Sequence, residues 1–364
     1  MRLGIDGKKI PEADKRGPIG SLQHAAELGM DGIFFRTVLD LSPDLDPGLL
    51  AEIRQQADRA DLYLETGLGK VNPFANPETP ELRALGNGDI VLGFRRMMEA
   101  CAEIGCTELW VGTANYKRAY RGKLAYDRFR TDVAWTEQLE ATADFLKILA
   151  PIAIDLGLHL NIETHEEITS FEVLRLVETV GPEAVGITFD TGNVLQRIEH
   201  PVRSAERVAP YVRQTHVKDA ALVHVPGGIG YQMRPVGTGA IDFASILRIL
   251  NAANPDLNLT LETDRSHADN PPGTPELNML IELDDQGFLD GHPDLTVSEL
   301  SEYLRMVRDY EQRVRDGEVP TLDEYRAQPY GFDEAIAFIK RSRDHIRTLC
   351  AAQGIPLTPT AAAL

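Results

Sequence analysis

The sequence predicts an α/β fold, a (β/α)8 TIM barrel with long loop insertions on the C-terminal face and a C-terminal helical extension. Two observations support this prediction. Eight short apolar runs, rich in branched or aromatic residues, recur along the chain, and most segments between them have helical periodicity. Strands that alternate with helices favour a parallel sheet covered by helices, and eight such units indicate a closed barrel. An open doubly wound sheet is the alternative.

The expected elements follow one another in a regular order. The eight runs expected to be strands are "RLGID", "GIFFR", "LYLET", "ELWVGT", "HLNIE", "VGITFD", "RQTHVKD" and "LTLET". Helical periodicity marks residues 18–28, 47–60, 89–104, 132–155, 168–180 and 242–253. Such barrels usually take about 250 residues, and this chain has 364. The excess follows the ends of four expected strands, at residues 66–88, 113–131, 220–240 and 265–297.

These four insertions are rich in proline, glycine and polar residues, which is typical of loops or lids. A barrel places all four on one face, because each follows the carboxyl end of a strand. Helical periodicity returns at residues 298–350, before the tail "GIPLTPTAAAL". We therefore expect a catalytic barrel domain at residues 1–312, insertions included. A helical extension and tail at residues 313–364 would pack on it.

Composition limits the classes of function. The chain is 43% hydrophobic and 26% charged, as ordinary globular proteins are, and no run approaches the roughly 18 apolar residues that cross a bilayer. Only three cysteines occur, which predicts a reducing cytoplasm and no disulfide framework. The net charge of −19 repels nucleic acid and anionic membranes. We expect a small-molecule partner and leave a homo-oligomer open.

Four consecutive expected strands end in an acidic or imidazole side chain: Glu163, Asp190, His216 and Glu262. Their neighbours in the chain are apolar and would face the helices: Ile162, Phe189, Val217 and Leu261. Because side chains alternate along a strand, the polar set points into the barrel mouth. Three carboxylates that meet there repel one another unless a cation neutralises them. Oxygen-rich ligation with one imidazole favours Mn²⁺ or Mg²⁺, and Co²⁺ or Zn²⁺ is compatible. The alternative is four separately hydrogen-bonded polar groups near solvent.

Five motifs in this region resemble those of a known family. "NIETHEE", "GITFDTGN", "THVKD", "RPVGTGAIDF" and "LTLETD" resemble the xylose isomerase-like TIM barrels, the sugar phosphate isomerase/epimerase superfamily, and the resemblance covers residues 1–264. It implies that the Glu–Asp–His–Glu set binds one divalent metal. It also implies that Glu163 and Glu262 form the acid–base pair that moves a proton between adjacent carbons of a ketose. Members include lyases of keto-inositols and dehydroshikimate, so the fold does not fix the reaction.

One departure from the family pattern narrows the function. Many relatives have a histidine three residues after the aspartate of "FDTG", and here that residue is Asn193. The apurinic endonucleases on this barrel use such a histidine to assemble several zinc ions. Asn193, only nine histidines and a net charge of −19 therefore argue against DNA repair. We place Asn193 in the substrate pocket, without the contact that the histidine would make.

Five further residues are candidates for the site. Lys218 lies two residues beyond His216 on the same face and would stabilise an enolate oxygen, unless it is a solvated lysine. His165 lies in phase with Glu163 and would donate to a substrate oxygen, or cap the structure. Three residues at the expected ends of strands two, three and four would line the substrate pocket: Arg36, Glu65 and Trp110.

These observations predict a divalent-metal-dependent isomerase or epimerase that acts on a small keto sugar or sugar acid through an enediolate. Glu163 and Glu262 would exchange protons with carbon on the two sides of that intermediate. One alternative is a metal-dependent lyase, a dehydratase or decarboxylase of a keto sugar acid. A non-catalytic sugar-binding barrel is the other, and the intact metal-ligand set argues against it.

Overall fold

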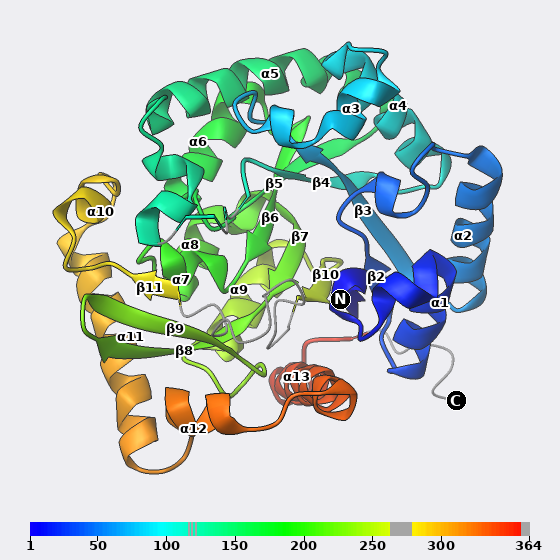
Figure 1. The fold of residues 1–364 in the computed structure, drawn as a ribbon. Helices are drawn as coiled ribbons and strands as arrows, with labels where there is room; N and C mark the ends of the chain where they lie inside the picture. The colour runs from blue at the N-terminus through cyan, green and yellow to red at the C-terminus, as the bar shows by residue number, and fades with distance from the viewer. Residues whose placement is uncertain (116, 118, 121, 263–278, 358–364) are drawn as a thin grey trace.

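The protein is described from a computed structural model, which covers residues 1–115, 117, 119–120, 122–262 and 279–357 (Figure 1). Eight parallel strands close into a barrel in the order β1-β10-β7-β6-β5-β4-β3-β2, with β1 paired to both β10 and β2. The strands are β1 (Arg2–Asp6), β2 (Gly32–Phe34), β3 (Tyr63–Lys70), β4 (Glu108–Gly112), β5 (His159–Glu163), β6 (Val185–Asp190), β7 (Val212–Val217) and β10 (Asn258–Leu261). This confirms the closed barrel and excludes the open sheet.

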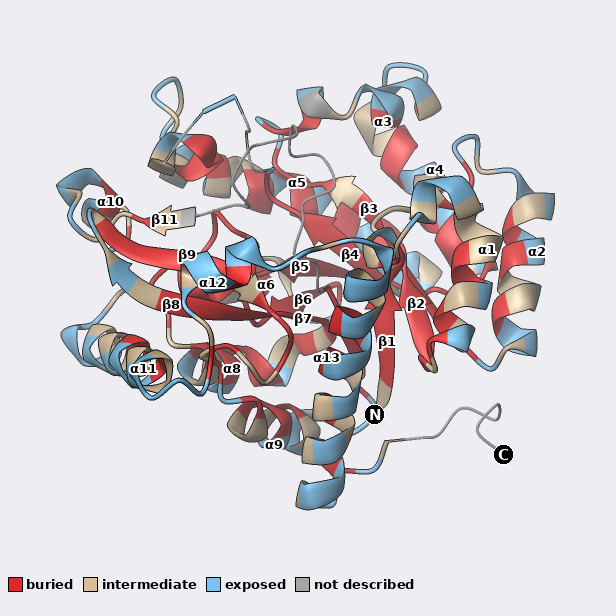
Figure 2. Ribbon diagram, turned by 60° about the horizontal axis from the view of Figure 1, so that its bottom comes forward, coloured by how far each residue is buried: buried red, intermediate tan, exposed pale blue. Residues whose placement is uncertain are grey.

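Helices surround the barrel and present their buried faces to it (Figure 2). The six periodic segments all form helices: α1 (Ala13–Glu27), α2 (Pro47–Arg59), α4 (Ile90–Glu103), α5 (Trp135–Leu156), α6 (Ser170–Val180) and α9 (Phe243–Ala253). The short helices α3 (Pro80–Leu85), α7 (Asn193–Gln196) and α8 (Pro201–Val208) were not predicted from periodicity. None of the helices in the described part of the chain is long and apolar enough to cross a membrane.

Local sequence signals set the ends of these helices. Asp46 accepts a hydrogen bond from the backbone of Leu49 and caps α2, which starts with proline. Thr169 and Glu172 form a reciprocal capping box at the start of α6. Gly157 ends α5 with a φ of 69°, a conformation that glycine adopts without strain. Each signal fixes the residue at which a helix begins or ends.

The side chain of Tyr63 fills part of the barrel interior because two neighbouring strands carry glycine. A Cβ atom at Gly4 would lie 2.2 Å from the Tyr63 hydroxyl, and one at Gly32 would lie 2.1 Å from its ring. The Tyr63 hydroxyl also lies 2.9 Å from Thr260 Oγ1 on β10. A packed interior of this kind closes the barrel below the mouth.

Helix α13 (Phe332–Gln353) packs against α9 and β10, beside the first strand of the barrel (Figure 2). Ile339, Ile346 and Cys350 are buried in the main hydrophobic core. Arg343 donates to the backbone of Leu28, just beyond α1. In this position α13 serves as the eighth outer helix of the barrel. The expected domain boundary at residues 312 and 313 falls inside α11 (Val297–Arg315).

Two insertions form a small second sheet rather than loops alone. Residues 220–240 contain most of a hairpin, β8 (Asp219–Val225) and β9 (Gly228–Arg234), to which β11 (Met279–Ile281) adds a third antiparallel strand. Helix α11 packs against β8, and α10 (Gln286–Asp290) and α12 (Leu322–Ala327) complete the region. The first part of the insertion expected at residues 265–297 lies outside the described residues, which resume at residue 279.

Because α13 belongs to the outer ring of the barrel, shortening a core side chain on this helix should destabilise the whole protein. Ile346 is fully buried in the main core, so Ile346→Ala should lower the free energy of unfolding by about 2–5 kcal/mol. Chemical denaturation should show one cooperative transition for this variant. Arg341→Ala, on the exposed face of the same helix, is the control and should change stability little. A separate low-stability transition for α13 would contradict its place in the barrel.

Candidate metal centre

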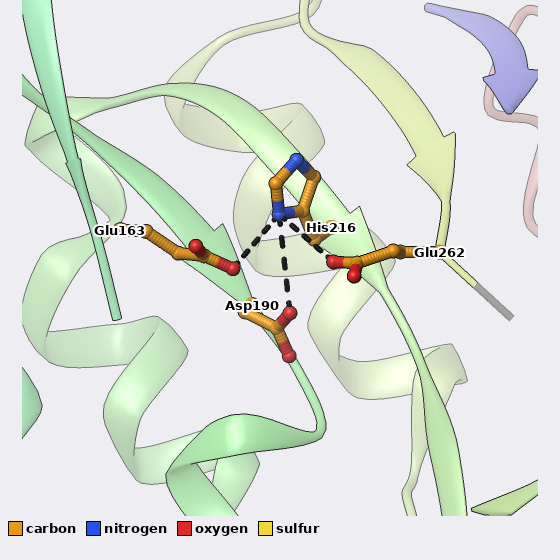
Figure 3. A group of neighbouring side chains, drawn as sticks. All are labelled: Glu163, Asp190, His216 and Glu262. Atoms are coloured by element: carbon orange, nitrogen blue, oxygen red, sulfur yellow. Dashed lines mark hydrogen bonds and ion pairs between the residues drawn. The ribbon is translucent and has the colours of Figure 1, made fainter. Parts of the chain in front are cut away.

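The four residues at the ends of consecutive strands meet at the barrel mouth. Glu163, Asp190, His216 and Glu262 are buried, and each offers a ligand atom within 4.8 Å of the others (Figure 3). His216 Nδ1 lies 2.8 Å from Glu163 Oε1 and 3.2 Å from Glu262 Oε2. It lies 4.0 Å from Asp190 Oδ2. The apolar neighbours of all four residues are buried in the core outside the barrel, as the alternation predicted.

Contacts outside the group hold these side chains in place. Asp190 Oδ1 accepts backbone hydrogen bonds of 2.8 Å from Gly192 and from Asn193, which orients the carboxylate. Trp110 Nε1 donates to Glu163 Oε2 at 2.8 Å. The ring of Phe34 lies 4.8 Å from the His216 ring. The carboxylates are therefore positioned by side chains of the barrel strands and by the backbone directly after β6.

The charges of the centre are strongly coupled. Burial, together with the negative charges of Glu163 and Glu262, raises the pKa of Asp190 to about 7, although Lys218 opposes the shift. Burial also disfavours the charge on Glu262, but Lys218 and His216 outweigh it and hold the pKa of Glu262 well below its usual value. Positive charge is thus required for these carboxylates to be ionised together.

Lys218 lies in the centre, where the sequence predicted it. Its Nζ atom lies 2.9 Å from Asp190 Oδ2 and 3.1 Å from Glu262 Oε2, and it donates to Asn193 Oδ1 at 3.3 Å. Asn193 Nδ2 in turn donates to Glu163 Oε1 at 3.4 Å. Lys218 is therefore an ion-paired group of the site and not a solvated lysine.

His165 lies beside the centre and is held by a second buried carboxylate. Its Nδ1 atom is 2.5 Å from Glu167 Oε2, and Thr113 donates to the other oxygen of Glu167. Burial would lower the pKa of His165, but Glu167 and Glu163 outweigh it and raise the pKa to about 10. Sequence reasoning did not single out Glu167 or Thr113, because both lie beyond the ends of their strands, where alternation no longer predicts the direction of a side chain.

Glu65 does not occupy the expected position at the end of a strand. It is the third residue of β3, which continues through "GLGK" to Lys70. Its carboxylate accepts hydrogen bonds from Asn258, the first residue of β10, at 2.8 Å and from Thr260 at 3.5 Å. Glu65 therefore lies deeper in the barrel than the metal-ligand set. Trp110 also lies within its strand rather than at the end, yet its indole reaches Glu163.

Sequence reasoning missed two charged residues near Glu262. Asp6 ends β1 and is completely buried, 3.8 Å from Arg36. The acid at the end of "RLGID" carries the same signal as the four chosen ligands and could have been found. Lys9 lies in the 3-10 turn after β1 (Gly7–Lys9), 3.9 Å from Glu262. Arg36, which was predicted, donates to Glu262 Oε1 at 3.0 Å.

The residues present fit a divalent metal. Three carboxylates and one imidazole converge within bonding reach of a single point, and they are oxygen-rich as hard cations prefer. Asp190 Oδ2 is buried and, apart from its ion pair with Lys218 Nζ at 2.9 Å, has no hydrogen-bond partner among the described residues. A buried carboxylate oxygen of this kind is a group that a metal would satisfy.

Comparison with known families agrees with this geometry. The profile of the xylose isomerase-like TIM barrels matches residues 22–283, which is most of the chain. This protein belongs to that family. Its matched region contains all four strand-end residues of the centre.

Curated relatives match over shorter segments. The chain is 37% identical over 93 residues to the uncharacterized protein YihM of Escherichia coli, covering 26% of this chain and 28% of that one. It is 28% identical over 127 residues to 3-oxo-isoapionate decarboxylase of Pectobacterium atrosepticum, covering 34% and 46%. It is 28% identical over 103 residues to inosose dehydratase of Bacillus anthracis, covering 27% and 35%. The matched segments span less than half the length of each relative.

Solved structures share the fold. D-psicose 3-epimerase of Clostridium cellulolyticum superposes with a TM-score of 0.57 at 16% identity, covering 85% of this chain and 99% of that chain. The 3-keto-D-glucoside 4-epimerase of Escherichia coli superposes with a TM-score of 0.54 at 17% identity, covering 74% and 94%. At these identities the likeness establishes the barrel architecture alone.

The convergence of four candidate ligands predicts that a substitution at one of them weakens metal binding. Asp190→Asn removes one charge but keeps an oxygen for the backbone hydrogen bonds, so it should sharply reduce metal content while the protein still folds. The increase in melting temperature that Mn²⁺ causes should also become smaller, because a metal stabilises the protein only when it binds the folded state. Glu65→Gln, a buried carboxylate outside the ligand set, is the control. One metal per chain in Asp190→Asn, with an unchanged melting shift, would contradict the assignment.

The buried position of Glu65 predicts a pH effect on stability. Burial raises its pKa to about 7, although the hydrogen bond from Asn258 opposes the shift. The folded protein then retains this proton better than the unfolded chain. The resulting stability is present below about pH 4.5 and is lost as pH rises through 7. Glu65→Gln should reduce the fall in unfolding free energy between pH 5 and 8 by up to about 3 kcal/mol.

Denaturation of the metal-free protein at several pH values measures this effect. Glu178→Gln, on the exposed face of α6, is the matched control and should keep the wild-type pH dependence. The same pH dependence in Glu65→Gln as in wild type would show that Glu65 is ionised throughout this range.

Proposed function

We propose that this protein is a divalent-metal-dependent isomerase or epimerase of a small keto sugar or sugar acid, working through an enediolate. The observation that carries the proposal is the buried group Glu163, Asp190, His216 and Glu262 at the barrel mouth. Membership in the xylose isomerase-like family and the shared fold with sugar epimerases support it. A bound divalent cation, Mn²⁺ or Mg²⁺ in this proposal, would polarise the substrate carbonyl and stabilise negative charge on its oxygens.

The two glutamates are the proposed acid–base pair. Glu163 and Glu262 lie on opposite sides of His216 Nδ1, at 2.8 and 3.2 Å (Figure 3). Each carboxylate keeps one oxygen toward the ligand group, and other residues hold the second oxygen: Trp110 for Glu163 and Arg36 for Glu262. A carbon placed between them would lose its proton to one glutamate and receive a proton from the other.

The remaining candidate residues act on substrate oxygens in this proposal. Lys218 would hold the developing enolate oxygen, because its ammonium already lies between two ligand carboxylates. His165, oriented by Glu167, would donate to a hydroxyl of the substrate. Asn193 and Trp110 would line the pocket, since both contact Glu163. Arg36 completes the set on the side of Glu262.

A lyase is the second candidate. Two curated relatives support this candidate, because one is a 3-oxo-isoapionate decarboxylase and the other an inosose dehydratase. In a dehydration, one glutamate would take the proton next to the carbonyl and the other would protonate the departing hydroxyl group. In a decarboxylation, loss of carbon dioxide would leave an enolate, and one glutamate in its protonated form would protonate the enolate carbon. The products distinguish the two reactions, because a lyase reaction of this kind releases water or carbon dioxide from the substrate.

Glu262→Gln tests the catalytic pair. The wild-type protein loaded with Mg²⁺ should exchange a carbon-bound proton of a substrate ketose or keto sugar acid with D₂O, with the carbon skeleton retained. Glu262→Gln keeps an oxygen that can ligate but removes the base, so exchange should slow by roughly 10²- to 10⁴-fold. Proton NMR over a panel of ketoses, keto-inositols and keto sugar acids measures the exchange.

Metal content is measured in the same samples, because a lost carboxylate also weakens ligation. Glu178→Gln is the control and should exchange at the wild-type rate. Near-normal exchange in metal-replete Glu262→Gln would make Glu262 a ligand only. Formation of carbon dioxide or a dehydrated product by the wild type would favour the lyase.

A further inference from the structure

Glu262 has more cationic neighbours than one carboxylate needs. Three side chains from separate strands surround it, Lys9 after β1, Arg36 after β2 and Lys218 after β7. Lys218 also pairs with Asp190 and so belongs to the ligand group. Lys9 and Arg36 contact no other metal-ligand residue within 4 Å among the described residues. They form a cationic pair on the β1–β2 side of the centre.

Arg36 has unused hydrogen-bonding capacity in this pair. Its Nη2 atom donates to Glu262 Oε1 at 3.0 Å, but its Nε atom is buried and has no hydrogen-bond partner. The side chain as a whole is 35% exposed, so part of Arg36 is accessible to a ligand. The Lys9 ammonium makes no hydrogen bond to any described residue, and its nearest carboxylate oxygen is 3.9 Å away. A buried donor without a partner, such as Arg36 Nε, is costly to leave unsatisfied.

The net charge of the residues around Glu262 also indicates that the site binds an anionic group. The ionisable residues that contact one another around Glu262 include four carboxylates and three cations: Asp6, Glu163, Asp190, Glu262, Lys9, Arg36 and Lys218. With a neutral His216 they carry one net negative charge. A divalent metal changes this to one net positive charge. Binding of a neutral sugar would leave that charge unbalanced in a buried site, whereas an anionic group would neutralise it.

We propose that the substrate is a keto sugar acid whose carboxylate lies close to the reacting carbon and binds Arg36 and Lys9. This inference rests on the proposed function and names the substrate class of the same site. A guanidinium binds a carboxylate through two parallel hydrogen bonds, and in the structure Arg36 uses only Nη2 for Glu262, so it keeps further donors for a ligand. Lys9 adds a second positive charge from the neighbouring strand.

The position of Arg36 and Lys9 limits where on the substrate the carboxylate can be attached. Arg36 contacts the carboxylate of Glu262, the proposed base, at 3.0 Å. A carbon that Glu262 deprotonates lies about 3–3.5 Å from its oxygen. An anion that also contacts Arg36 must therefore lie within a few bonds of that carbon. A phosphate at the far end of a sugar chain would not reach the pair in the same pose.

Binding of two matched ligands tests the proposal. 2-Keto-D-gluconate and D-fructose differ at C1, where one has a carboxylate and the other a hydroxymethyl group. Calorimetry on the full-length protein loaded with Mg²⁺ should show at least about tenfold tighter binding of 2-keto-D-gluconate. Arg36→Met should remove most of that preference, Lys9→Met should reduce it, and Arg36→Lys should restore part of it. Lys8→Met is the control, because Lys8 pairs with Asp40 outside the site and its loss should leave the preference unchanged.

Three results would overturn the proposal. The first is equal or tighter binding of D-fructose by the wild type. The second is a preference for 2-keto-D-gluconate that survives in the Arg36→Met, Lys9→Met double variant, since chelation by the metal would then account for it. The third is binding of D-fructose 6-phosphate in preference to 2-keto-D-gluconate. In each of these cases, deuterium exchange into D-fructose would still support the proposed function. If the metal-loaded wild type exchanges no keto compound of the panel, that result would count against the proposed function instead.

Discussion

Repulsion among three carboxylates buried at one end of a barrel is the constraint on which the site depends. Glu163, Asp190 and Glu262 are each at most 3% exposed, so water cannot screen their charges. The structure balances them with His216 and Lys218, which contact the same oxygens that a metal would bind. A metal would compete with Lys218 for these oxygens. Displaced from them, Lys218 would be available to a substrate oxygen.

The barrel supplies the rigidity that such a centre requires. Consecutive strands β5, β6, β7 and β10 present the ligands in register, for instance Asp190 opposite His216 and His216 opposite Thr260. Backbone donors after β6 fix Asp190. Helix α13, far along the chain, closes the outer ring beside α9. The insertions that follow the strands add the β8–β9–β11 sheet without supplying a metal ligand from the described residues.

Alternation at the strand ends was sufficient to predict that Glu163, Asp190, His216 and Glu262 meet at the barrel mouth, because a polar residue flanked by core residues has only one direction available. Asp6 carries the same signal at the end of β1. Glu65 was misplaced because Gly67 and Gly69 suggested a loop, whereas a bulge between them lets β3 continue to Lys70. Lys9 lies in a turn without periodicity, and its contact with Glu262 depends on how β1 pairs with β10. Tertiary pairing of that kind is not encoded in a local pattern.

Anomalous diffraction from crystals grown with Mn²⁺ tests the central claim most directly. The account predicts one strong anomalous peak per chain, within about 2.5 Å of an oxygen of Glu163, Asp190 and Glu262 and of a nitrogen of His216. Lys218 should have moved away from Asp190 Oδ2. A centre without an anomalous peak, in which Lys218 still bridges Asp190 and Glu262 at saturating Mn²⁺, would contradict it. The four residues would then form a structural ion-pair network rather than a metal site.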